Sequence, residues 1–135
     1  MKKTFILLLA ALLLATPTKV IASEAIPDYG VAPCWENMST VIVDIGFSGT
    51  NGLASVTADR ILGVTTSIEA TLTVYRKVGN TWVYVTSTSG SSSRSLNLDV
   101  EFTGIKGATY KAVAEVTATG TEGTDMDTIS ETCVC

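Results

Sequence analysis

The sequence predicts an all-β fold, a single antiparallel two-sheet sandwich of about seven strands. Three observations support this prediction. After residue 38 the apolar positions recur with a period of two, and β-branched residues occur throughout. No stretch after that point has the periodicity of a helix. Short clusters of glycine, serine and asparagine interrupt the alternation at regular intervals, as turns do. An open barrel built from the same strands is the alternative.

The first half of the domain contains four predicted strands. Valine, isoleucine and phenylalanine occupy every second position of residues 41–47, the first strand. Alanine and valine alternate with serine, threonine and aspartate at residues 54–59, the second strand. The third strand covers residues 68–75, where isoleucine, alanine, leucine and valine share one side, and the fourth covers residues 81–87. The serine-rich residues 87–93 are interpreted as a mobile loop.

Three further strands are predicted in the second half. Residues 95–102 alternate most sharply, with leucine, valine and phenylalanine between serine, asparagine, aspartate and glutamate. Tyrosine, alanine and valine share one side of residues 110–118, and a last strand runs from about residue 125 toward Cys135. Tyr110 lies near a strand start, where the tyrosine corner of immunoglobulin-like sandwiches is found. We therefore expect immunoglobulin-like topology, with a plain buried tyrosine as the alternative.

The N-terminal residues predict export. Lys2 and Lys3 precede an apolar run at residues 5–15, and residues 20–22 offer the small side chains that signal peptidase requires. The apolar run is shorter than the roughly 20 residues that span a bilayer. A second acceptable cleavage site follows Ala25. The predicted organisation is a secretory signal peptide at residues 1–22, an extended segment at 23–37 and a β-sandwich domain at 38–135.

The charge balance of the exported chain limits its partners. After cleavage six basic residues remain against all 13 acidic ones, which gives a net charge near −7. Such a chain is repelled by phosphate backbones and by anionic lipids, so we expect no nucleic-acid partner. A second apolar stretch is lacking. We therefore expect a secreted, extracellular protein with no stable membrane anchor after signal removal.

The three cysteines predict a disulfide, because extracellular conditions are oxidising. Cys133 and Cys135 are two residues apart, so on one strand their Cα atoms lie near the upper limit of about 7 Å for a bridge. A bridge from Cys34 to Cys133 or to Cys135 is easier, and it would stabilise the fold by roughly 4.7 kcal/mol through a loop of about 100 residues. The remaining thiol either is incidental or joins two copies in a disulfide-linked homodimer.

The segment around Gly79-Asn80 predicts a hairpin with a two-residue turn that begins with glycine. Counting outward from this turn pairs Val78 with Thr81, Lys77 with Trp82, and Arg76 with Val83. The next pairs are Tyr75 with Tyr84 and Val74 with Val85. On this register the core face carries Leu72, Val74, Val83 and Val85.

The other face of this hairpin carries a candidate binding patch, Tyr75, Lys77, Trp82 and Tyr84, with Lys77 over Trp82. Three alternatives remain open. The aromatic side chains stiffen the hairpin, or the segment around Trp35 covers them, or a slip of one residue in the register turns them inward.

The residue types give little support to catalysis. Histidine, the most common general base and metal ligand, does not occur in the sequence. Four carboxylates occupy outward strand positions or turns, where we expect them to solubilise the protein: Asp44, Asp59, Asp99 and Glu101. Cys133-Val134-Cys135 has neither the spacing of a redox pair nor the ligands of a zinc site. We therefore expect no catalytic residue, no enzymatic activity and no cofactor.

A glycine-rich acidic turn is a weak candidate metal site. Glu122, Asp125 and Asp127 could offer oxygen ligands to calcium, although their spacing falls short of an EF-hand. An ordinary solvated turn is the simpler interpretation, so we expect no metal.

Several sequence patterns carry a resemblance to a known family. They are Gly-Leu-Ala at residues 52–54, ATLTVYRKVGNTWVYV at 70–85, KGATYKA at 106–112 and Ile-Ser-Glu-Thr at 129–132. Residues 35–132 thereby resemble a family of small secreted β-sandwich proteins of Gram-positive, often gut-dwelling, bacteria that is catalogued as a domain of unknown function. The Cys-Val-Cys ending lies outside that pattern. The resemblance implies a bacterial β-scaffold, and it implies no site residue.

Together these observations favour a secreted, non-enzymatic binding or surface-interaction module. The expected partner is an unknown glycan or protein, contacted through the candidate patch. The alternative is a structural or assembly subunit, whose copies are joined through an exposed edge strand or through an intermolecular disulfide.

Overall fold

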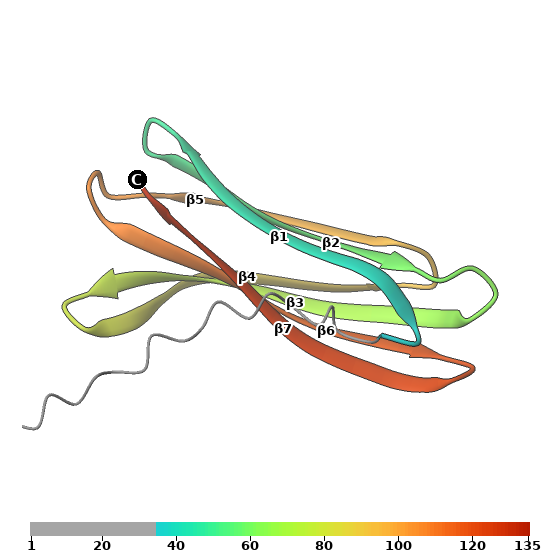
Figure 1. Ribbon diagram of the computed structural model, residues 1–135. Helices are drawn as coiled ribbons and strands as arrows, with labels where there is room; N and C mark the ends of the chain where they lie inside the picture. The colour runs from blue at the N-terminus through green and yellow to red at the C-terminus, as the bar shows by residue number, and fades with distance from the viewer. Residues whose placement is uncertain (1–34) are drawn as a thin grey trace, which may run out of the picture. The chain divides into compact units, whose positions relative to one another are not determined.

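The computed structural model describes residues 35–135 and has two packed antiparallel sheets (Figure 1). One sheet has the strand order β1-β2-β5 and the other has the order β4-β3-β6-β7. The strands are β1 (Met38–Ser48), β2 (Asn51–Arg60), β3 (Thr65–Val78), β4 (Thr81–Ser92), β5 (Leu96–Thr103), β6 (Thr109–Gly120) and β7 (Gly123–Val134). The predicted seven-stranded sandwich is therefore confirmed. Within residues 35–135 there is no helix long and apolar enough to cross a membrane.

The chain crosses between the sheets after β2, after β4 and after β5. This is the connectivity of an immunoglobulin-like sandwich, except that the fourth strand pairs with the third instead of the fifth. The turns alternate between the two ends of the sandwich. The β1–β2, β3–β4 and β5–β6 turns lie at the same end as the C-terminus (Figure 1).

The interior is filled by the side chains that the period-two alternation predicted. The least exposed of them come from β2, β3 and β6, which are flanked by other strands on both sides in the sheets. Five of the eight buried apolar residues on β2 and β6 are alanines, which let the two sheets approach closely. The buried set is Met38, Ile45, Ala54, Val56, Ala58, Ile68, Ala70, Leu72, Val74, Leu96, Tyr110, Ala112, Ala114, Val116 and Ala118.

Larger side chains close the core near the β1–β2 turn. The rings of Phe47, Phe102 and Tyr110 pack with centroids 5.1–5.4 Å apart. Glycine at position 52 makes room for them, since a methyl group there would lie 2.5 Å from Phe102. The cluster therefore depends on the absence of a side chain at Gly52.

Tyr110 also forms the predicted tyrosine corner. Its side chain is 1% exposed, and its hydroxyl oxygen accepts a hydrogen bond of 2.8 Å from the backbone N–H of Ile105. The bond fixes the loop between β5 and β6 to the strand that follows it, as in other sandwiches of this class. The alternative of a tyrosine that is buried without this bond is thereby eliminated.

Two predictions about β4 were wrong. Residues 87–92 are not a loop, because they continue β4 and pair with β3 from Ser87–Thr73 to Ser92–Ile68. The ladder of β3 supplies backbone partners that override the weak strand preference of serine. The register also shifts between Val74 and Tyr75, so Val74 pairs with Thr86 instead of Val85.

This shift is a β-bulge at Val85, and one extra residue on β4 is accommodated there. Val85 still packs against the core, whereas Val83 is 42% exposed. The predicted core face of the hairpin is therefore correct as far as Val85 and ends before Val83.

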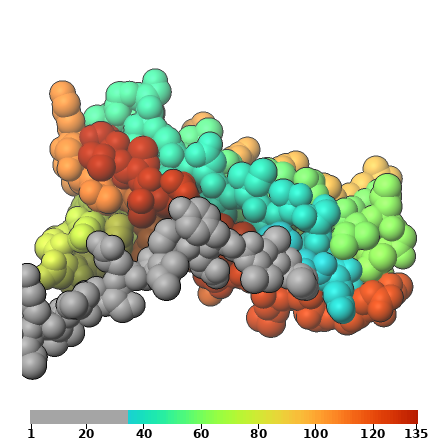
Figure 2. Space-filling model, in the orientation of Figure 1, coloured from blue at the N-terminus to red at the C-terminus, as the bar shows by residue number. Residues whose placement is uncertain are grey.

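The edges of the two sheets meet along the sides of the sandwich. The surfaces of β1 and β7 adjoin (Figure 2), and β4 lies beside β5 on the other side. Asp125 on β7 fixes the segment that enters β1, because its Oδ2 accepts hydrogen bonds from the backbone N–H groups of Glu36 at 2.8 Å and Asn37 at 2.6 Å.

Candidate functional site

The β3–β4 hairpin positions the candidate patch. Its turn has Gly79 at φ +61°, while Asn80 has a negative φ, as in a type II′ turn. The register next to the turn is the predicted one, with Lys77 opposite Trp82 and Tyr75 opposite Tyr84. Trp82 is therefore not sealed between the sheets.

The patch lies on the outer face of the four-stranded sheet. Leu72 and Val74 on β3 are fully buried toward the other sheet, so the alternating positions Tyr75 and Lys77 point outward. Side chains that face each other across two strands share a side, which places Trp82 and Tyr84 on the same outer face. Tyr84 is 60% exposed, and its hydroxyl lies 3.1 Å from Ser87 Oγ.

A fifth side chain, Lys111 on β6, completes the patch. Lys111 lies directly opposite Tyr75 in the sheet. Its Nζ atom is 4.3 Å from the centroid of the Trp82 ring and 5.8 Å from that of Tyr75. Lys77 Nζ lies 6.0 Å from the Trp82 centroid, at the outer limit of a cation–π contact. The predicted cation over Trp82 thus comes mainly from Lys111.

The aromatic–lysine patch (Tyr75, Lys77, Trp82, Tyr84 and Lys111) is not covered by Trp35. That indole packs against the core cluster, beside the segment that enters β1. Its neighbour Glu36 is held at Asp125, near the start of β7 and away from the β3–β4 turn. Trp35 itself therefore does not cover the patch, and the part of that segment before Trp35 lies outside the described residues.

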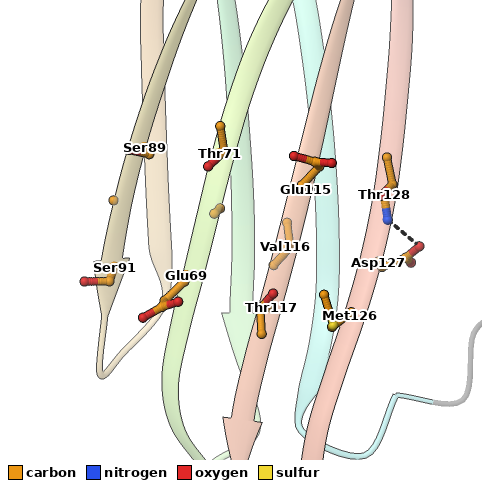
Figure 3. A pocket seen from close by; sticks show the side chains of 12 residues that line it. Glu69, Thr71, Ser89, Ser91, Glu115, Val116, Thr117, Met126, Asp127 and Thr128 are labelled. Carbon is orange, nitrogen blue, oxygen red and sulfur yellow. Dashed lines mark hydrogen bonds between the residues drawn. The ribbon is translucent and has the colours of Figure 1, made fainter.

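A shallow hollow occupies the far half of the same outer face (Figure 3). It is lined by short hydroxyl side chains between two longer carboxylates, Glu69 on β3 and Glu115 on β6. Glu69 faces Thr117, and Glu115 faces Thr71, so the two carboxylates are diagonal neighbours on adjacent strands. Both are exposed to solvent. The sequence interpretation missed this hollow, because it treated the serines of β4 as a loop.

A second hollow lies on the outer face of the three-stranded sheet. Gly46 leaves open space there, and Asp44, Leu53 and Glu101 border it. Asp44 Oδ1 accepts a hydrogen bond of 2.9 Å from the N–H of Ile45. These carboxylates occupy the outward strand positions that the sequence predicted.

The three acidic residues of the weak calcium candidate do not converge. Asp125 is bound to two backbone N–H groups, Asp127 Oδ1 accepts a bond of 2.8 Å from the N–H of Thr128, and Glu122 lies in the exposed β6–β7 turn. Within residues 35–135, no group of three histidine, cysteine, aspartate or glutamate side chains is arranged to hold a metal ion.

Cys133, on the inner side of β7, and Cys135, directly after that strand, are both half-buried. Cys133 faces Tyr110, and Cys135 Sγ lies 3.7 Å from the carbonyl oxygen of Gly49. Neither thiol is in a disulfide among the described residues. The predicted partner Cys34 lies outside the described residues, as do the signal peptide at residues 1–22 and most of the extended segment.

Comparison with known proteins adds no relative to this description. No protein-family model matches the chain, and no curated protein matches it. The resemblance to the family of small secreted bacterial sandwich proteins therefore stays a prediction, and it rests on the sequence patterns quoted above.

Proposed function

We propose that this protein is an exported, non-enzymatic binding module that contacts a glycan or a protein surface through the aromatic–lysine patch. The observation that carries the proposal is the outward position of three aromatic side chains on one short hairpin. The core is complete without them, since β3 buries Leu72 and Val74 on its other side. Exposed aromatic clusters of this kind favour interaction surfaces.

The chemistry of the patch supports a flat ligand. Aromatic rings present a broad apolar face that can pack against the C–H groups of a sugar ring or against apolar side chains. Tyr75 lies on β3, which is paired on both sides, and Trp82 and Tyr84 lie on β4, which is paired with β3, so the backbone beneath the rings loses little conformational entropy on binding. Stiffening of the hairpin by cross-strand pairs is compatible with this role.

The absence of histidine from the sequence supports a non-enzymatic role. Glu69 and Glu115, which are diagonal neighbours on adjacent strands, lie in an open hollow where water has free access. Glycosidases instead use a general acid whose environment differs from that of its partner carboxylate.

Fluorescence of Trp82 tests the proposal. We suggest Trp35→Phe as the background, since Trp82 is then the only tryptophan. Glycans that bind on an array should shift its emission on titration, and binding should be lost in Trp82→Ala. Ile42→Ala, on the outer face of the three-stranded sheet and 58% exposed, is the matched control and should bind normally. An array on which no glycan binds would remove the glycan half of the proposal.

The edge strand β4 favours assembly as a second candidate function. From Thr81 to Ser92 it contains no charged residue and no proline, the usual protections of a free edge. By contrast, β7 carries Asp125, Asp127 and Glu131 on its inner side. If β4 joins copies, sedimentation should detect oligomers, and Ser89→Lys should convert them to monomers. If a cysteine joins copies, a non-reducing gel should detect disulfide-linked dimers. A monomer in both experiments counts against assembly.

A further inference from the structure

If the aromatic–lysine patch binds a ligand, as proposed above, the surroundings of its two lysines determine which class of ligand it accepts. On the outer face Lys111 lies beside Tyr75 on β3 and Thr132 on β7, with Val113 next along its own strand. Lys77 lies beside Trp82 and Tyr75. The sheet register therefore places no carboxylate next to either lysine on this face among the described residues.

The two lysine ammonium groups of the patch are positive charges in a domain whose net charge is negative. Residues 23–135 carry only six basic side chains, and two of them meet at the patch. Lys77 is exposed and Lys111 and Trp82 are half-buried, so water still reaches their contacts with the ring and weakens them. An anionic group of a ligand can form a direct ion pair with a lysine that leaves the Trp82 ring, and no contact within the core is lost.

The opposite end of the same face limits how much negative charge a ligand can carry. Glu115 lies four residues from Lys111 along β6, about 13 Å away on a strand. Glu69 lies eight residues from Lys77 along β3, about 26 Å away. A polyanion that extended from the patch across the sheet would meet both carboxylates and the net negative charge of the domain.

We infer that the patch selects a glycan that carries a single acidic sugar, with one carboxylate or sulfate group, in preference to both neutral glycans and polyanions. The acidic group binds between Lys77 and Lys111. The face of the same or the adjoining sugar ring packs on the aromatic side chains. The neutral remainder of the glycan extends toward the hydroxyl-lined hollow between Glu69 and Glu115, where hydroxyl groups of sugars can donate hydrogen bonds to the carboxylates.

An array of matched glycans tests this inference, with three versions of each backbone. One ends in a neutral sugar, one ends in the corresponding uronic acid or monosulfated sugar, and one is sulfated throughout. We expect the singly charged version to bind about fivefold more tightly than the other two, which is the upper range for one exposed ion pair. This preference should fall steeply when the salt concentration is raised from 50 to 500 mM, because the Debye length then shortens about threefold.

Charge variants separate ion pairing from structure. Lys77→Gln with Lys111→Gln should abolish the preference, so that the singly charged version binds no more tightly than the neutral version. Replacement of both lysines by arginine should restore the preference. Arg94→Gln, just beyond the far end of β4 and exposed, is the matched control and should change nothing.

The outcomes distinguish the two proposals. Equal binding of neutral and singly charged glycans, or tighter binding of the polyanion, overturns the inference and leaves the binding function intact. Persistence of the preference in the glutamine variant also overturns it. If no version binds at any position of the array, both the inference and glycan binding by the patch are wrong.

Discussion

Tyr110 joins the aromatic cluster at one end of the core to the loop that precedes its own strand. Its ring packs against Phe47 and Phe102, and its hydroxyl satisfies the backbone N–H of Ile105. One side chain thus contributes both apolar burial and a hydrogen bond to a part-buried donor. Removal of the hydroxyl alone leaves that donor without its partner.

Tyr110→Phe should therefore lower the free energy of unfolding by about 1–2 kcal/mol. Urea denaturation, followed by far-UV circular dichroism, measures the change. Tyr84→Phe is the matched control, because its hydroxyl is exposed and bonds only to Ser87, and a change below about 0.5 kcal/mol is expected there. Equal losses in the two variants would contradict the role assigned to the Ile105 bond.

Glycine is required at position 52 for a different physical reason. A methyl group at Gly52 would lie 2.5 Å from Phe102 and 2.8 Å from Phe47, so both rings would have to move. We expect Gly52→Ala to destabilise the protein by about 1–3 kcal/mol through overpacking. Gly46→Ala, in the neighbouring strand, meets open space and should change stability by less than about 0.5 kcal/mol. Thermal unfolding of the two variants makes the comparison.

At the scale of elements, the β3–β4 hairpin determines where the aromatic–lysine patch lies. Its turn fixes the pairing of Lys77 with Trp82 and of Tyr75 with Tyr84. The bulge at Val85 then absorbs one residue, so the polar remainder of β4 can still pair with β3 as far as Ser92. The turn and the bulge together let one strand carry the patch at one end and line the hollow at the other.

The turn should tolerate a side chain at its second position and not at its first. Gly79→Ala places an L-residue at φ +61° and should cost about 1–2 kcal/mol. Asn80→Ala, at negative φ, should be nearly neutral. Near-UV circular dichroism of Trp82 in the Trp35→Phe background reports the hairpin, and chemical denaturation reports its stability. A neutral Gly79→Ala would mean that the turn differs from type II′.

At the scale of the whole molecule, few polar contacts hold the two sheets together, and Asp125 supplies two of them. Its carboxylate on β7 binds the backbone N–H groups of Glu36 and Asn37, just before β1 of the other sheet begins. Hydrogen bonds to a charged acceptor are stronger than neutral ones. The remaining cohesion comes from the apolar interior, which includes alanines from both sheets.

We predict that Asp125→Ala lowers the free energy of unfolding by about 2 kcal/mol, because two N–H donors lose a charged acceptor. Asp127→Ala, which removes only a local bond to the next residue, should cost less than about 0.5 kcal/mol. Urea denaturation gives both values. Hydrogen exchange at Glu36 and Asn37 should accelerate in the Asp125 variant alone, and unchanged protection would contradict the contact.

The alternation of apolar residues was sufficient to predict the class of fold, because a period of two assigns each side chain to a face whatever its strand neighbours are. The turn at Gly79 likewise fixed the pairs nearest to it, from Val78–Thr81 to Tyr75–Tyr84, since counting outward needs no knowledge of other strands. From Val74 onward the predicted pairs were wrong, because the alternation of residue types does not reveal a bulge.

The local period and one local turn were enough to predict the sandwich, most of its core and the outward position of Tyr75, Trp82 and Tyr84. The pairing of β6 with β3 was known only from the folded molecule; it brings Lys111 within 4.3 Å of the centroid of the Trp82 ring and aligns Glu115 with Thr71. Positions far apart in the chain meet through the order of the strands in a sheet and the register between them. These depend on the packing of the whole core, and no local pattern encodes them.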